Sequence, residues 1–120
     1  MPDTAEVVAL YTRSWINCDL TTVRRLIAPD AEIDWNLDAP VDDVELVQTL
    51  HRMAVFADSV TVAARVHGAD GAALVYDLAA PFGTARFAEF LSVRDGRITE
   101  VRQVYDVVAI DRYFPGLTDQ

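Results

Sequence analysis

Residues 72–107 decide the fold, and their sequence is AALVYDLAAPFGTARFAEFLSVRDGRITEVRQVYDV. β-branched and aromatic residues recur along this segment, and two short turn sequences interrupt it. The turns are Pro-Phe-Gly at 81–83 and Arg-Asp-Gly at 94–96, and Asp-Gly between two apolar runs is a strong hairpin signal. The segment therefore predicts three consecutive strands, at 72–80, 84–93 and 97–107.

The residues before this segment predict one more long strand, at 59–67, and a series of helices. Asp3, Asp19 and Asp42 are suited to cap helices, because an aspartate side chain accepts hydrogen bonds from the first free backbone N–H groups. The predicted helices span 4–17, the residues between Asp19 and Pro29, and about 43–56. The alternating residues 31–36 predict a short strand between the second and third helices.

Helices followed by an antiparallel meander indicate an α+β fold, with the helices on one face of a curved sheet. A chain of 120 residues suits a single domain spanning 1–120. Residues 72–76 are apolar on both sides of their strand, which indicates that the second face of the sheet also meets a partner.

Charge and composition exclude several functions. The net charge is −9 and the pI is about 4.4, so binding to nucleic acids or anionic membranes is not expected. The ten basic residues are all arginine, which excludes lysine Schiff-base chemistry. Cys18 is the single cysteine, so no internal disulfide or thiolate zinc site is expected, and a reducing, cytoplasmic setting fits. The acidic residues at 38–45 lack the spacing of a calcium loop, so we expect no metal.

Two segments resemble a known superfamily. One runs from Tyr11 to Trp35 and includes Ala-Pro-Asp-Ala-Glu-Ile at 28–33; the other is the final hairpin at 90–106. Together with the order of elements, they resemble the nuclear-transport-factor-2-like, or SnoaL-like, superfamily. The resemblance implies a cone-shaped (α+β) barrel of three helices packed on a curved, mostly antiparallel sheet. It also implies a homodimer formed through the convex face of the sheet.

The resemblance identifies function less well, because this fold hosts isomerases, cyclases, dehydratases, epoxide hydrolases and non-catalytic binders. Ketosteroid isomerases carry an oxyanion-hole tyrosine on the first helix, and Tyr11 matches it. Their general-base aspartate falls at Trp35, and their second oxyanion donor, a protonated aspartate, falls at Ala88. Limonene-epoxide hydrolases carry an aspartate where this chain has Gln103, and a water-holding tyrosine and asparagine near Ile33 and Trp35.

Asp77 is the nearest candidate for the acid/base of SnoaL-type cyclases. It lies in the apolar strand at 72–80, where burial would raise its pKa. Strand alternation leaves the opposite arrangement open, with Tyr76 and Leu78 facing inward and Asp77 outward. Arg86 alternates with Ala88 and Phe90, and the hairpin alignment puts this set on the concave face.

The predicted site follows from these comparisons. Gln103 and Tyr105 share one face of the last strand, and Trp35 is expected to form a pocket wall. The expected catalytic residues are Asp77, Tyr11 and Arg86, and the expected substrate-binding residues are Trp35, Gln103, Tyr105, Ala88, Phe90 and Ile33.

The function expected from these features is a small-molecule enzyme that uses acid/base chemistry without a cofactor. An isomerase, cyclase or epoxide hydrolase type fits, acting on an apolar polyketide-, terpenoid- or steroid-like molecule. The alternatives are a non-catalytic domain that binds a small ligand, and a structural dimerisation domain. The composition, which is rich in Ala, Val, Asp and Arg, suggests a GC-rich bacterial source.

Overall fold

A computed structural model describes residues 2–35, 42–81 and 83–105. Its elements follow the predicted order: α1 (Thr4–Ile16), α2 (Leu20–Leu26), β1 (Ile27–Trp35), α3 (Asp43–Phe56), β2 (Ser59–His67), β3 (Gly71–Ala80), β4 (Gly83–Arg94) and β5 (Arg97–Tyr105). The α+β cone predicted from the sequence is confirmed.

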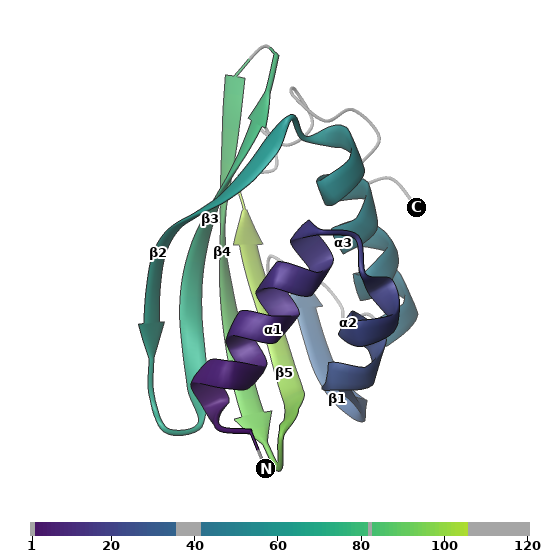
Figure 1. Ribbon diagram of the computed structural model, residues 1–120, viewed down its shortest axis with the longest axis vertical. Helices are drawn as coiled ribbons and strands as arrows, with labels where there is room; N and C mark the ends of the chain where they lie inside the picture. The colour runs from purple at the N-terminus through teal and green to yellow at the C-terminus, as the bar shows by residue number, and fades with distance from the viewer. Residues whose placement is uncertain (1, 36–41, 82, 106–120) are drawn as a thin grey trace.

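The five strands form one sheet in the order β1-β5-β4-β3-β2. All neighbouring strands are antiparallel except β1, which pairs in parallel with β5. The three helices lie together against one face of the curved sheet (Figure 1). We call this face of the sheet the inner face, and the opposite one the outer face. None of the described helices is long and apolar enough to cross a membrane.

Each helix begins at the aspartate that the sequence predicted. The carboxylates of Asp3, Asp19 and Asp42 accept hydrogen bonds from backbone N–H groups three residues later, at 2.8, 3.2 and 2.8 Å. Such caps satisfy backbone donors that have no partner inside the helix. Between α1 and α2, Cys18 has a φ of 60°, and this left-handed residue redirects the chain.

Two features of the sheet set its shape. The hairpin between β4 and β5 turns at Asp95 and Gly96, whose φ values of 53° and 76° suit the tight two-residue turn that the sequence indicated. Irregular pairing occurs between Val62 and Ala64 and between Ser92 and Val93. Such bulges bend a sheet and increase its twist, which lets the inner face curve around the helices.

Strand β1 begins at Ile27, four residues before the predicted start, and it contains Pro29. The proline is tolerated because β1 is an edge strand and because its register with β5 shifts between Ile27 and Glu32. The predicted last strand extended to residue 107, but its final two residues lie outside the described part of the chain.

Side-chain alternation in the two central strands decides which residues reach the interior. On β3, Leu74, Tyr76 and Leu78 are buried beneath the helices, and on β4 the buried set is Ala85, Phe87, Glu89, Leu91 and Val93. All but one of these residues are apolar or aromatic. The exception is Glu89.

Candidate functional site

Glu89 is the centre of the candidate site. Its side chain is fully buried on the inner face of β4, between Phe87 and Leu91 along the strand. Within the described ranges it is the only buried residue with an ionisable acid or base, apart from the tyrosines. Because buried carboxyl groups need hydrogen-bond partners, the groups that surround Glu89 decide what it can do.

Three side chains donate hydrogen bonds to the Glu89 carboxyl. The Tyr11 hydroxyl on α1 donates to Oε2 at 2.9 Å, and the Tyr76 hydroxyl on β3 donates to Oε1 at 2.9 Å. The Nε2 amide of Gln103 on β5 donates to Oε2 at 2.7 Å. The strand register accounts for part of this convergence, because Glu89 pairs directly with Gln103 across the ladder.

The surroundings of Glu89 act on its pKa in opposite directions. Burial raises the pKa of Glu89, because an ion loses its hydration in the apolar interior. The hydrogen bonds from Gln103, Tyr11 and Tyr76 favour the ionised form and lower the pKa, but burial is the larger effect. Glu89 therefore holds its proton to a higher pH than an exposed glutamate does.

The two tyrosines are affected by the same environment. Burial and the neighbouring negative charge of Glu89 raise the pKa of both Tyr11 and Tyr76 well above the ordinary tyrosine value. Both phenols therefore stay protonated and act as hydrogen-bond donors. The Tyr76 oxygen also lies 3.1 Å from the Oγ1 of Thr12 on α1.

An aromatic cluster borders the carboxyl. The Tyr76 ring stacks on Phe87 with centroids 4.6 Å apart, and the Trp15 ring meets Tyr76 edge-on at 5.3 Å. All three side chains are buried. Tyr76 thus belongs both to the aromatic cluster and to the hydrogen bonds at Glu89, so the polar group lies next to the aromatic rings.

Several of the predicted site residues do reach the interior. Tyr11 and Gln103 are both buried and both contact Glu89. Ile33 is buried in the core on β1, and Tyr105, half-buried, packs against the core from the same face of β5 as Gln103. The backbone of Trp35 pairs with Gln103, but its side chain lies outside the described part of the structure.

Asp77 and Arg86 lie on the outer face, so their predicted placement in the interior is wrong. The Arg86 guanidinium donates to the Asp77 carboxylate at 2.6 and 3.0 Å, and the Arg86 side chain is 66% exposed. These hydrogen bonds hold the pKa of Asp77 below its usual range, the opposite of the expected shift. Of the two arrangements that alternation allowed, the structure has the one with Tyr76 and Leu78 inside.

The predicted placement of Ala88 and Phe90 on the concave face is wrong for the same reason. Both point to the outer face, and Phe90 is 47% exposed. A shift of one residue along a strand exchanges its two faces, so the hairpin alignment placed the wrong set inside. The next residue along the strand, Glu89, carries a carboxyl and lies on the inner face.

The sequence did contain a signal for Glu89. Phe87, Leu91 and Val93 recur at every second position of β4 with Glu89 among them, whereas the opposite phase contains Arg86 and Ser92. The larger apolar set indicates the buried face. A glutamate in that set conflicts with burial, and only its partners on α1, β3 and β5 resolve the conflict.

No metal-binding cluster accompanies this site. Nowhere in the described ranges do three His, Cys, Asp or Glu side chains come together in a way that could hold an ion. The donors at Glu89 are phenols and an amide, which suit a carboxylate or a polar group of an organic molecule.

Comparisons with known proteins agree on the fold. No family model matches the sequence, and no curated protein matches it. A loop-truncated variant of IdmH is 26% identical, with a TM-score of 0.74, over 92% of this chain and 98% of that one. An NTF2-like protein from Cytophaga hutchinsonii is 11% identical, with a TM-score of 0.74, over 92% of this chain and 96% of that one.

A steroid delta-isomerase from Pseudomonas aeruginosa has the same fold, with 14% identity and a TM-score of 0.75 over 91% of this chain and 83% of that one. The structural neighbours thus include an enzyme as well as proteins of unknown function. The helices on a curved sheet, the element order and these neighbours together show that the chain has the nuclear-transport-factor-2-like fold.

Proposed function

We propose that the protein is a cofactor-independent enzyme in which Glu89 is the acid/base. The observation that carries the proposal is a fully buried carboxyl held by two phenols and an amide beside an aromatic cluster. Burial raises the pKa of Glu89, which brings a carboxyl closer to the range where it can both take and return a proton. A reaction of the isomerase, cyclase or epoxide hydrolase type fits, on an apolar polyketide-, terpenoid- or steroid-like substrate.

The simplest reaction of this kind moves a proton within a ketone. The Glu89 carboxylate removes a proton from a carbon next to the carbonyl, the C–H electron pair forms a C=C bond, and the carbonyl electrons move to oxygen. In a β,γ-unsaturated ketone this enolate is conjugated with the existing C=C bond, so protonated Glu89 returns the proton to the γ-carbon, the remaining C=C bond ends in the α,β position and the carbonyl re-forms. These reaction steps need no co-reactant, because the same carboxyl group takes and gives the proton.

The tyrosines support this step. The protonated Glu89 accepts hydrogen bonds less strongly than the ion does, so Tyr11 can turn its O–H toward the enolate oxygen. The two phenols keep their protons because burial and Glu89 raise their pKa. The aromatic cluster of Trp15, Tyr76 and Phe87 supplies an apolar surface, and Tyr105 and Ile33 extend the proposed wall.

Two substitutions test the proposal. Wild-type protein, Glu89→Gln and Asp77→Asn are assayed on 2-tetralone, a β,γ-unsaturated steroid ketone and limonene epoxide. Exchange of ketone hydrogens in D2O and product formation are followed by NMR. Glu89→Gln keeps the shape but cannot take a proton, so it should lower turnover by at least about 100-fold. Asp77→Asn should leave turnover unchanged, because Asp77 lies on the outer face. Equal turnover by Glu89→Gln and wild type would refute the role of Glu89.

A non-catalytic binding or dimerisation domain is the second candidate. It is favoured by the enclosure of Glu89, whose carboxyl has three donors and no exposed surface. A purely structural network would have this arrangement as well. No exchange and no turnover of any of the three compounds by wild-type protein would favour this candidate.

We further propose that two copies of the chain pair through the outer face. Register places Ala64, Val75, Ala88 and Val104 in one row across the sheet, and Val66, Ala73 and Phe90 in the next. Val66, Phe90 and Val104 are 67%, 47% and 52% exposed. An apolar patch of this kind across the middle of a sheet is typical of a protein interface.

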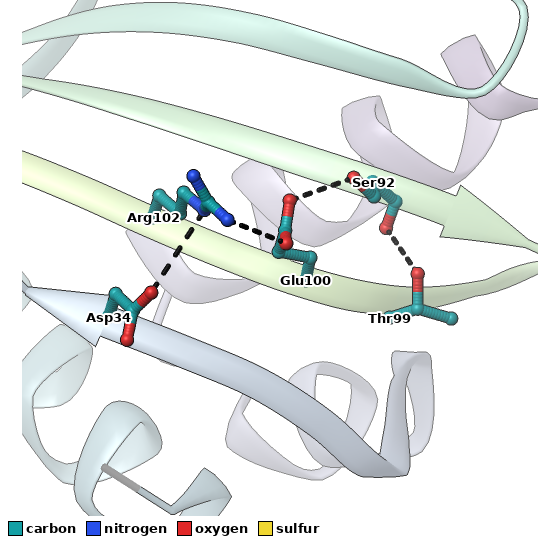
Figure 2. Close-up of polar contacts among 5 residues, drawn as sticks. All are labelled: Asp34, Ser92, Thr99, Glu100 and Arg102. Atoms are coloured by element: carbon teal, nitrogen blue, oxygen red, sulfur yellow. Dashed lines mark hydrogen bonds and ion pairs between the residues drawn. The ribbon is translucent and has the colours of Figure 1, made fainter. Parts of the chain in front are cut away.

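Charged groups border this apolar patch on the outer face. At one border Arg102 lies between Asp34 and Glu100, with N–O distances of 4.0 and 3.2 Å, and Ser92 donates to Glu100 at 3.2 Å (Figure 2). At the other border lies the pair of Asp77 and Arg86. An apolar centre with a polar rim is the usual anatomy of an interface, and it supports the proposed homodimer.

A further inference from the structure

Gln103 has one amide atom engaged and one free. Its Nε2 donates to Glu89 at 2.7 Å, whereas its Oε1 is buried and has no hydrogen-bond partner. The residue is 1% exposed, so solvent does not satisfy this oxygen from outside. Buried acceptors without a partner are rare in folded proteins, and one beside a candidate site indicates a place for a ligand group.

The neighbours of Gln103 fix which amide atom is free. The Nε2 atom donates to Glu89 at 2.7 Å, and the ionised form of Glu89 requires this orientation because a carboxylate only accepts hydrogen bonds. Tyr11 shares the Glu89 Oε2 atom with Gln103, and Tyr76 takes Oε1. A flipped amide would set its carbonyl oxygen against the carboxylate. The free atom at Gln103 is therefore an acceptor, and it calls for a donor from the ligand.

The charge of the interior limits the ligand further. No arginine or histidine is buried in the described ranges, while Glu89 contributes a negative charge when ionised. An anionic ligand would be repelled and left without a counter-charge. The adjacent rings of Tyr76 and Phe87, stacked at 4.6 Å, favour a flat apolar body. The ligand that fits is a neutral, largely aromatic or apolar molecule with a hydroxyl.

We propose that Gln103 is a specificity-determining residue, whose free carbonyl oxygen accepts a hydrogen bond from a hydroxyl or enol of a neutral apolar ligand held beside Glu89. This inference rests on the site of the proposed function, but it concerns binding and not turnover. In an enzyme that forms an enol, the same contact would favour the enol over the ketone, since only the enol has a proton to donate.

The test compares two probes that differ in one donor. Binding of 2-naphthol and of 2-methoxynaphthalene is measured by titration calorimetry on the wild-type protein, on Gln103→Met and on Thr99→Val, a control on the same strand. Wild type should prefer 2-naphthol by about tenfold, the effect of one hydrogen bond to a buried acceptor. Gln103→Met should abolish the preference, so that the two probes bind with an affinity ratio of about 1. Thr99→Val should retain the preference of the wild type.

The outcomes separate this inference from the proposed function. Three results would each overturn the role of Gln103. The wild type could bind the two probes equally, it could bind neither at millimolar concentration, or the preference for 2-naphthol could survive in Gln103→Met. The wild-type comparison needs no variant, so the inference stays testable if Gln103→Met fails to fold. Loss of turnover in Glu89→Gln, by contrast, bears on the acid/base role alone.

Discussion

At the scale of the residue, Glu89 is an ionisable carboxyl in a fully buried position, and these two properties usually exclude each other. An ionised carboxyl in an apolar interior loses its hydration, which is unfavourable by several kcal/mol, on the order of what a whole domain has in net stability. Tyr11, Tyr76 and Gln103 offset part of that loss by donating to both oxygens. The remaining cost raises the pKa of Glu89 and makes its ionisation oppose folding.

Glu89→Gln should therefore change how stability depends on pH. The folded state holds the proton of Glu89 more tightly than the unfolded state, so unfolding free energy falls as pH rises from the ordinary glutamate value of 4.5 to the raised pKa. Within that window the wild type should lose up to about 1.4 kcal/mol per pH unit relative to Glu89→Gln, which does not titrate. Urea unfolding of both proteins between pH 5 and pH 8 measures this difference. Parallel pH profiles would show that Glu89 is not perturbed by burial.

At the scale of the element, β3 and β4 approach each other closely at Gly71. A methyl group added there would lie 2.6 Å from the backbone oxygen of Leu91, a separation that real side chains do not adopt. At Gly68, three residues earlier in the turn, the nearest atom to such a methyl group is 3.8 Å away. The two glycines are close in sequence, but only one is required by packing.

Gly71→Ala should lower the unfolding free energy by about 2 kcal/mol, because the two strands must separate to admit the methyl group. The control Gly68→Ala should change it by less than about 0.5 kcal/mol, since the added methyl group makes only ordinary contacts. Chemical denaturation of both variants decides the matter. Similar losses at the two positions would mean that the strand contact at Gly71 does not limit the sheet.

At the scale of the whole molecule, the helices cover the inner face of the sheet, whereas among the described residues nothing covers the outer face. The three helices lie over the inner face (Figure 1). Val66, Phe90 and Val104 stay exposed on the outer face. A sheet with apolar side chains on both faces is stabilised when the second face also meets a partner. A second copy is the partner we propose, since the apolar patch and its charged borders can face their own equivalents across a two-fold axis.

Val104→Asp should convert the proposed dimer into a monomer of 13.3 kDa, because it puts an unpaired charge at the centre of the interface. Val55→Asp is the matched control, since Val55 is 53% exposed but lies on α3, away from the outer face. Sedimentation at micromolar concentration should give twice the monomer mass for wild type and for Val55→Asp. A monomeric wild type would show that the outer face is not a self-association surface.

By itself, the sequence determined the elements and their order. Asp3, Asp19 and Asp42 cap the three helices, and Asp95 and Gly96 make the tight turn, because caps and turns are local chemistry between residues a few positions apart. It also identified Tyr11 and Gln103 as interior residues, through the resemblance and through alternation on the last strand.

Only the tertiary structure decided which face of β3 and β4 is inside. Alternation has a period of two, so a one-residue error exchanges Glu89 and Tyr76 for Ala88 and Asp77. On β4 the apolar signal for the inner phase is weakened by Ala88 and Phe90 on the other face and by Glu89 itself. The partners that make a buried glutamate tolerable come from α1, β3 and β5, with Tyr11 78 positions away in the chain. Apolar alternation on β4 favours the phase that contains Glu89, but a glutamate there conflicts with burial until its partners are placed, so Glu89 became a candidate only once the helices and strands were packed together.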